Sequence, residues 1–121
     1  MKIRIKGNNI RLRLTKKEVD LFSKTGEFVE STVFFNKTFT YRLQAKDSIK
    51  TLEADFIEDT ISVYIPSEAR RKWASSSLVG YSNVNLTNNT LLSILVEKDF
   101  VCLDDRLEDQ SDNYPNPRFK K

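Results

Sequence analysis

One thiol and five carboxylates gather near the end of this 121-residue chain, and together they form its densest set of metal-ligating groups. A thiolate and carboxylate oxygens can hold a divalent cation. The spacing, however, matches no calcium loop, and the segment has neither a second cysteine nor a histidine. Two interpretations stay open, a divalent-metal site with or without hydrolytic activity and a structural arm, and the spacing favours the arm. The candidate ligands are Cys102, Asp104, Asp105, Glu108, Asp109 and Asp112.

The chain contains no histidine at all, which excludes Ser-His-Asp and Cys-His catalysis. Cys102 would act as a nucleophile only if a cation such as Lys98 or Arg106 lowered its pKa. Sequence alone places no two carboxylates at a separation suited to acid-base work. No cofactor-binding motif is present apart from the candidate metal ligands. The pattern therefore leaves enzymatic activity open and favours a non-enzymatic protein.

Positive charge is concentrated at the opposite end of the chain. Residues 1–24 carry eight Lys/Arg against two Asp/Glu, whereas residues 99–113 carry six Asp/Glu against Arg106 alone. A basic surface of this kind binds phosphates or acidic partners. The alternative, which the pattern favours, is the solvated outer face of a hairpin, paired in part with the acidic tail. The basic residues are Lys2, Arg4, Lys6, Arg11 and Arg13.

These basic residues alternate strictly with isoleucine and leucine, which is the period of half-buried strands. The break at Gly7-Asn8-Asn9 predicts a hairpin between strands at about 2–6 and 9–14. The basic side chains should then share one face of the hairpin, and the apolar side chains should share the other.

A short helix is predicted next, because Thr15 and Glu18 form a capping box and Gly26 is a typical helix terminator. Residues 27–36 and 38–45 are rich in Phe, Val, Thr and Tyr and predict two more strands. The first half of the chain is therefore predicted to be β-β-α-β-β.

The same order of elements returns after Asp47. The second set is predicted as strands at 51–58 and 61–65, a helix from about 67 to 75, and strands at 78–86 and 90–98. At an offset of 51 residues, 12 of the 17 apolar positions between residues 2 and 46 coincide with apolar residues. Phe22 and Trp73 coincide on the two helices and are expected to anchor the core. We expect one domain, residues 1–121, with internal repeats at about 2–47 and 53–98.

The segment from Ile61 through Pro66 to Trp73, followed by two strands, resembles the strand, helix and hairpin of the AbrB/MraZ swapped-hairpin barrels. The resemblance implies a mainly β fold with two short helices (α+β). Its two pseudo-twofold halves would interlock into one closed or partly closed barrel. It also implies DNA binding through basic residues of the first hairpin. The second copy places Glu53 and Asp55 where the first has Lys2 and Arg4, which argues against a symmetric DNA reader.

Residues 99–121 are acidic, contain Pro115 and Pro117, and are predicted to form an irregular C-terminal arm. Two motifs at the end of the chain, Glu-Lys-Asp-Phe-x-Cys-Leu and Glu-Asp-x-Ser-Asp-x-Tyr-Pro-Asn-Pro, resemble an uncharacterised family of small bacterial proteins. The resemblance spans nearly the whole chain, and it implies no activity.

The single cysteine and the lack of a long apolar run predict a cytoplasmic protein that does not enter membranes. We expect an interaction module, monomeric or homodimeric, that binds a protein partner. The alternatives are a nucleic-acid-binding protein that uses the basic hairpin and a metal protein that uses the acidic arm.

Overall fold

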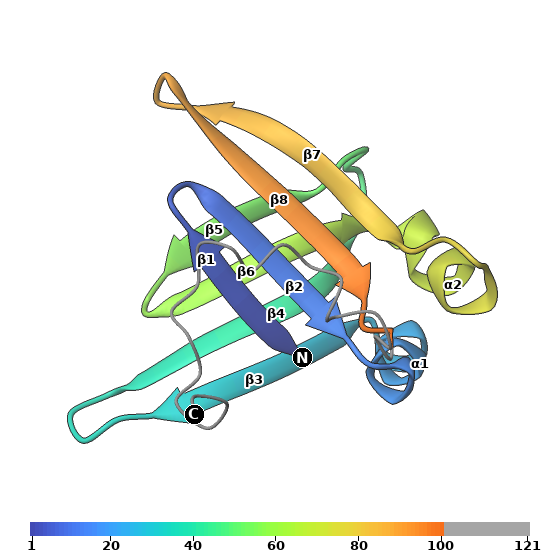
Figure 1. The fold of residues 1–121 in the computed structure, drawn as a ribbon, viewed down its shortest axis with the longest axis horizontal. Helices are drawn as coiled ribbons and strands as arrows, with labels where there is room; N and C mark the ends of the chain where they lie inside the picture. Colours follow the sequence, from blue (N-terminus) through green and yellow to red (C-terminus); the bar gives the residue numbers. More distant parts are fainter. Residues whose placement is uncertain (101–121) are drawn as a thin grey trace, which may run out of the picture.

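The computed structural model describes residues 1–100, which form eight strands and two short helices (Figure 1). The first half comprises β1 (Lys2–Lys6), β2 (Asn9–Leu14), α1 (Lys16–Thr25), β3 (Glu27–Val33) and β4 (Thr38–Lys46). The second half comprises β5 (Glu53–Ile57), β6 (Thr60–Pro66), α2 (Ser67–Ser75), β7 (Gly80–Thr87) and β8 (Thr90–Lys98). Both halves have the predicted order β-β-α-β-β.

The hairpins of the two halves are exchanged between two four-stranded sheets. One sheet has the order β1-β2-β8-β7 and the other has the order β3-β4-β6-β5. Each sheet is therefore one hairpin from each half, joined through a central parallel pair, β2 with β8 or β4 with β6. No ladder of backbone hydrogen bonds joins the two sheets within residues 1–100. The mainly β, α+β prediction is confirmed, in its partly closed form.

The strand register shows which residues of the two halves are equivalent. Leu12 lies opposite Val96, and Val63 lies opposite Leu43. Leu12 thus corresponds to Val63 at the predicted offset of 51, but Leu43 corresponds to Val96 at an offset of 53. The offset changes because the connection from α2 to β7 is longer than the connection from α1 to β3.

Helix α1 begins and ends where the capping residues predict. Thr15 accepts a hydrogen bond from the Glu18 backbone N–H, and the Glu18 carboxylate accepts one from the Thr15 backbone N–H. Gly26 ends the helix in the left-handed conformation, with φ at 81°. A side chain at Gly26 would also meet Arg70 of α2, whose guanidinium donates to the carbonyls of Ser23 and Lys24. This contact joins the end of α1 to α2.

The four hairpin turns lie at one end of the molecule and the two helices at the other (Figure 1). Gly7 has a positive φ in the first turn, and the pairs Glu58-Asp59 and Asn88-Asn89 have positive φ in the third and fourth. Two successive residues with positive φ define a type I′ turn, whose twist matches that of the flanking strands. The two ends are called the turn end and the helix end.

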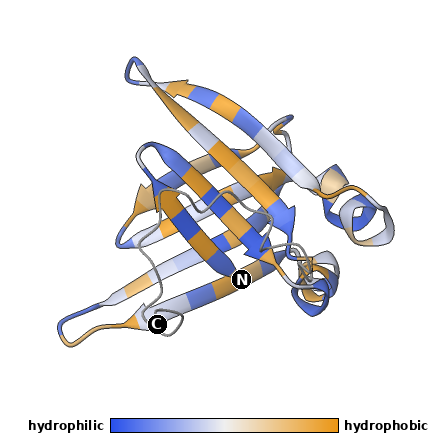
Figure 2. Ribbon diagram, viewed as in Figure 1, coloured by the Kyte–Doolittle hydropathy of each residue, from blue (hydrophilic) through white to orange (hydrophobic). Residues whose placement is uncertain are grey.

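The core lies between the sheets and extends beneath the helices. Figure 2 shows the hydrophobic and hydrophilic bands that alternate along β1 and β2, as the sequence predicts. At the helix end, Phe22 and Trp73 are fully buried and meet edge to face, with ring centroids 6.5 Å apart. Tyr81 of β7 meets the Trp73 ring edge to face, with ring centroids 6.1 Å apart. The prediction that Phe22 and Trp73 anchor the core is confirmed.

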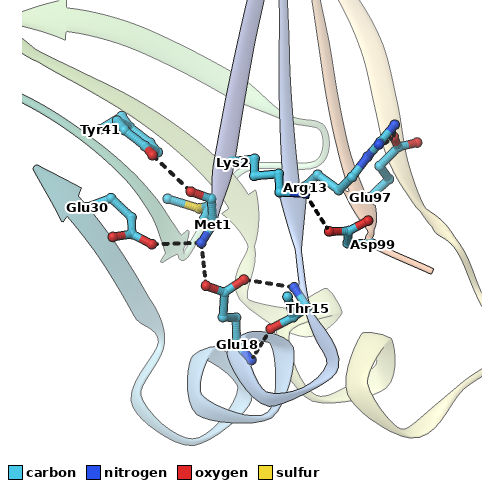
Figure 3. Close-up of polar contacts among 9 residues, drawn as sticks. All are labelled: Met1, Lys2, Arg13, Thr15, Glu18, Glu30, Tyr41, Glu97 and Asp99. Atoms are coloured by element: carbon cyan, nitrogen blue, oxygen red, sulfur yellow. Dashed lines mark hydrogen bonds and ion pairs between the residues drawn. The ribbon is translucent and has the colours of Figure 1, made fainter. Parts of the chain in front are cut away.

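Polar contacts bridge both seams between the sheets at equivalent places. At one seam the Met1 amine donates to Glu18 and, over 2.7 Å, to Glu30, while the Tyr41 hydroxyl donates to the Met1 carbonyl (Figure 3). At the other seam, Asn83 and Asn85 side chains donate to the Leu52 carbonyl at 3.0 and 3.1 Å. Met1 corresponds to Leu52 by the offset of 51, and both side chains are buried. The two seams are closed by different chemistry at matching positions.

Burial alone would lower the pKa of the Met1 amine, but its hydrogen bonds and attraction to Glu18 and Glu30 outweigh this effect and raise the pKa. Burial likewise would raise the pKa of Glu18, but the ammonium group and Thr15 lower it. The seam therefore holds an ion pair whose two members are each stabilised in the charged form.

Replacing Trp73 with alanine is expected to lower the free energy of unfolding by about 3–5 kcal/mol, because the substitution opens a cavity between α1, α2 and β7. Urea denaturation followed by circular dichroism measures the change. Leu21→Ala, at a half-exposed position of α1, is the control and should change it by less than about 0.5 kcal/mol. Equal effects of the two substitutions would contradict the assignment of the core.

Raising the pH above 8.0, the ordinary pKa of an amino terminus, is expected to lower the free energy of unfolding. An amine whose pKa is raised on folding contributes fully below its ordinary value, and the contribution is lost as the pH rises through the higher folded value. Urea titrations at constant ionic strength measure the decline. Glu30→Gln removes one of the two charges and should make the decline shallower, whereas an unchanged slope would assign the titration to another group.

Candidate anion-binding face

The five predicted basic residues lie together on the outer surface of the sheet β1-β2-β8-β7. In the β1-β2 register, Lys2 lies opposite Arg13, Arg4 lies opposite Arg11, and Lys6 lies opposite Asn9. These residues alternate with Ile3, Ile5, Ile10, Leu12 and Leu14, whose side chains belong to the other face of the hairpin. The sequence prediction of one shared basic surface is confirmed. It is called the basic face and consists of Lys2, Arg4, Lys6, Arg11 and Arg13.

Two like-charged pairs directly opposite one another are unfavourable in an antiparallel sheet. Lys2 with Arg13 and Arg4 with Arg11 are two such pairs on alternate rungs of the ladder, separated by the Ile3–Leu12 rung, so they are neighbours on the same face. A half-exposed sheet face has no structural need for this arrangement, because threonine or valine would satisfy the strand equally well. Local choices that oppose the stability of a fold are most often found where a protein binds something.

Two carboxylates offset part of this repulsion (Figure 3). Glu97 on β8 lies opposite Arg13 and accepts hydrogen bonds from its Nε at 3.0 Å and Nη2 at 2.8 Å. The same carboxylate lies 3.6 Å from Arg11 Nε, and Asp99 lies 3.4 Å from Lys2 Nζ. The pairing of the basic hairpin with the start of the acidic tail, which the sequence left as an alternative, is therefore observed at Asp99.

Arg4 and Lys6 have no ion-pair partner within residues 1–100. Two shallow clefts lie beside them, with volumes of about 260 and 180 Å³, and Arg4 and Arg11 line both. Leu95 of β8, which lies opposite Arg11, adds an apolar wall to the larger cleft. An anionic group held between Arg4 and Arg11 would satisfy both guanidinium groups and relieve their mutual repulsion.

The equivalent surface of the second half has a different character. Glu53 lies opposite Tyr64, and Asp55 lies opposite Ser62, on the outer face of the other sheet. The Tyr64 hydroxyl donates to Asp55 at 2.9 Å, and Arg42 Nε donates to the Ser62 hydroxyl at 2.7 Å. The predicted asymmetry of charge between the two halves is therefore present in the structure, and only the first half has a basic face.

The predicted metal ligands Cys102, Asp104, Asp105, Glu108, Asp109 and Asp112 lie outside the described residues, so their arrangement stays a prediction. Within residues 1–100, no three side chains among His, Cys, Asp and Glu come together as a candidate metal site. The predicted arm overlaps the described part only at Asp99 and Phe100. Asp99 is fixed there, because its backbone N–H donates to the Leu14 carbonyl at 2.7 Å.

Two polar contacts, one on the basic face and one at the neighbouring seam, were not predicted from the sequence. Glu97 contacts Arg11 and Arg13 only because β2 and β8 are parallel neighbours, 84 residues apart along the chain. The Met1 amine was not predicted to pair with Glu18 either, although the Thr15 capping box already fixes the position of the Glu18 carboxylate.

A model of a protein family matches residues 1–118, which is nearly the entire chain. The chain belongs to the family of unknown function DUF7009. This match confirms the resemblance to an uncharacterised family, and it covers both sequence motifs at the end of the chain. No curated protein and no solved structure matches this DUF7009 chain. A bacterial origin and a relation to AbrB/MraZ barrels stay predictions.

Neither helix in the described part of this DUF7009 protein is long and apolar enough to cross a membrane.

Substituting Arg4 with threonine is expected to raise the free energy of unfolding by about 0.2–1 kcal/mol, because it removes the repulsion with Arg11 and breaks no ion pair within residues 1–100. Arg13→Thr is the matched control. This variant loses the two hydrogen bonds that Arg13 donates to Glu97, so its free energy of unfolding should not rise. Thermal and urea denaturation measure both variants. A destabilised Arg4→Thr protein would show that the arginine serves the fold.

Proposed function

We propose that this protein is a non-enzymatic binding module whose basic face takes a partner protein segment with carboxylates next to apolar side chains. The observation that carries the proposal is the Arg4–Arg11 pair, two opposed cations with a shared cleft on each side. Such a pair costs stability in the free protein and gains two charge-assisted interactions when an anion enters.

The surroundings of this pair favour a protein segment as the anion. Arg11 has Arg4 on one side and Leu95 on the other in the sheet register. Val84 extends the apolar surface on β7 and is half exposed. A segment that places carboxylates over the arginines and aliphatic side chains over Leu95 and Val84 would match both kinds of surface.

Nucleic acid is the second candidate, because the basic face would also attract phosphates. A duplex reader with two related halves gains from two basic contact surfaces. Here the equivalent surface of the second half carries Glu53 and Asp55, which would repel phosphate.

The single cysteine supports a reducing cytoplasm as the place where the module acts.

Fluorescence anisotropy on the full chain tests the proposal with a labelled short peptide of alternating glutamate and leucine. We expect the peptide to bind and its affinity to fall with added salt. The double variant Arg4→Ala/Arg11→Ala should weaken binding at least about tenfold, because a hydrogen bond to a charged group contributes about 1.5–3 kcal/mol. The same peptide with glutamine in place of glutamate should bind more weakly than the acidic one.

The control variant is Lys16→Ala/Lys17→Ala, which removes the same charge from exposed positions of α1 at the helix end. It should leave peptide binding nearly unchanged. Equal loss in the two double variants would show a general effect of net charge and would contradict a site at Arg4 and Arg11. Tighter binding of a DNA duplex or single-stranded RNA, lost in the Arg4/Arg11 variant alone, would replace the protein partner with nucleic acid.

A further inference from the structure

The space between the two sheets is closed at the helix end and open at the turn end. Phe22 and Trp73 fill the helix end beneath α1 and α2. At the turn end a cavity of about 500 Å³ opens to solvent, and Ile5 and Phe56 at its rim are 54% and 66% exposed. The cavity is called the mouth, and it is lined by Ile5, Ile10, Phe39, Ala54, Asp55, Phe56, Ile61 and Leu92.

The lining of the mouth follows the pseudo-twofold symmetry of the chain. Ile5 and Ile10 lie opposite each other on β1 and β2, just as Phe56 and Ile61 lie opposite each other on β5 and β6. The mouth is therefore the unfilled end of the shared core. Apolar surface of this extent exposed to water is unfavourable, and in soluble domains it commonly marks an interface.

A second apolar feature projects from the same end of the molecule. Val33 at the end of β3 and Phe34 and Phe35 in the connection to β4 are exposed, and the Phe35 side chain is completely exposed. The Phe34 N–H donates to the Lys37 carbonyl at 2.8 Å, so the loop has a defined turn. This hairpin extends beyond the turn of β1 and β2 in Figure 1. The apolar residues 33–35 near its end are called the tip.

We propose that a second copy of this chain covers the mouth, and that each copy inserts its tip into the mouth of the other about a twofold axis. An apolar projection and an apolar cavity at the same end of one molecule are the two requirements of such a self-complementary contact. This surface meets the basic face only at Lys6, and the proposed dimer does not depend on the proposed function.

The apolar area at the turn end is sufficient for a stable dimer. An aromatic side chain buries about 150–250 Å² when it is covered. Phe34 and Phe35 from both copies would therefore supply about half of the roughly 1,600 Å² that a specific interface typically buries. The rims of the two mouths would supply further area, since Ile5 and Phe56 are covered at the same time.

The charges around the mouth favour a second copy over a lipid surface. Lys6 and Lys37 stand at the turns of the two sheets together with Glu58 and Asp59. Lys37 already lies 3.3 Å from Asp59 within one copy. A rim of mixed sign can pair with a twofold-related copy of itself, whereas binding to an anionic membrane requires an excess of basic residues.

Light scattering coupled to size-exclusion chromatography on the full chain tests the proposal. We expect a mass of twice 14.1 kDa that falls towards 14.1 kDa on dilution. Phe34→Ser/Phe35→Ser in the tip and Phe56→Ser in the mouth should each raise the dimer dissociation constant at least about tenfold. Leu78→Ser is the control, because Leu78 is equally apolar and half exposed but lies on the connection that follows α2.

A mixing experiment distinguishes the tip-into-mouth contact from nonspecific hydrophobic association. The tip variant retains an intact mouth, and the mouth variant retains an intact tip, so a mixed dimer keeps one of its two contacts while the tip-variant homodimer keeps none. We expect the mixture to dimerise more tightly than the tip variant alone.

Three results would overturn the inference. The first is a wild-type chain that remains monomeric at millimolar concentration. The second is a dimer that the tip and mouth variants leave intact. The third is a monomer that cosediments with anionic lipid vesicles through Phe34 and Phe35, which would assign the tip to membranes. Thermal denaturation of the variants at low concentration should match the wild type, since these side chains are exposed in one copy.

Discussion

The parallel pairing of strands from opposite halves is the constraint on which the rest of this structure depends. β2 pairs with β8 and β4 pairs with β6, so neither half has a sheet of its own. Each hairpin would otherwise be an isolated pair of strands, which is marginal in water. The exchange turns four such hairpins into two four-stranded sheets with one common core. It also places Glu97 beside Arg11 and Arg13. The shared core is filled at the helix end and open to solvent at the turn end.

The two halves share a core and differ on their surfaces. Leu12 and Val63 are equivalent and fully buried, and Phe22 and Trp73 are equivalent and in contact. On the outer surface, Arg4 corresponds to Asp55. A fold of two equivalent halves needs symmetry only where the halves pack together, because their solvated faces are free to differ. The basic face therefore occurs on one half only. The mouth, which is the open end of the core, is lined by equivalent residues of both halves.

Local features of this chain were predictable from sequence because their causes are local. Thr15, Glu18 and Gly26 fix α1, and Gly7 with the alternation of Lys/Arg and Ile/Leu fixes the first hairpin. The extent of β3 was predicted too long, through residue 36, since Val33, Phe34 and Phe35 have high strand propensity. In the structure the ladder stops at Val33, opposite Thr38, which is the first residue of β4. Strand propensity depends on the side chain of the residue itself, whereas a ladder of backbone hydrogen bonds also requires a neighbouring strand.

Features set by distant parts of the chain were not predictable from local pattern. The offset of 53 at the last hairpin shows only in its register against β2, and Glu97 meets Arg13 through the same register. The Met1 amine reaches Glu30 because β1 and β3 border the same seam. Such contacts depend on which hairpins pair, and periodicity carries no information about that choice.

The exchange of hairpins also determines which strand pairs can form first while the chain is being synthesised. Asn9 finds its β8 partner, Ser93, only after most of the chain has been synthesised, whereas β4 and β6 are separated only by β5 and its two connections. Contacts so far apart in sequence slow folding, because a long loop must close before any pairing stabilises it. During synthesis the β1-β2 hairpin therefore waits with an unpaired edge. The charged Lys and Arg of that hairpin disfavour association of such an edge with other nascent chains, a role that ends once the finished sheet has formed.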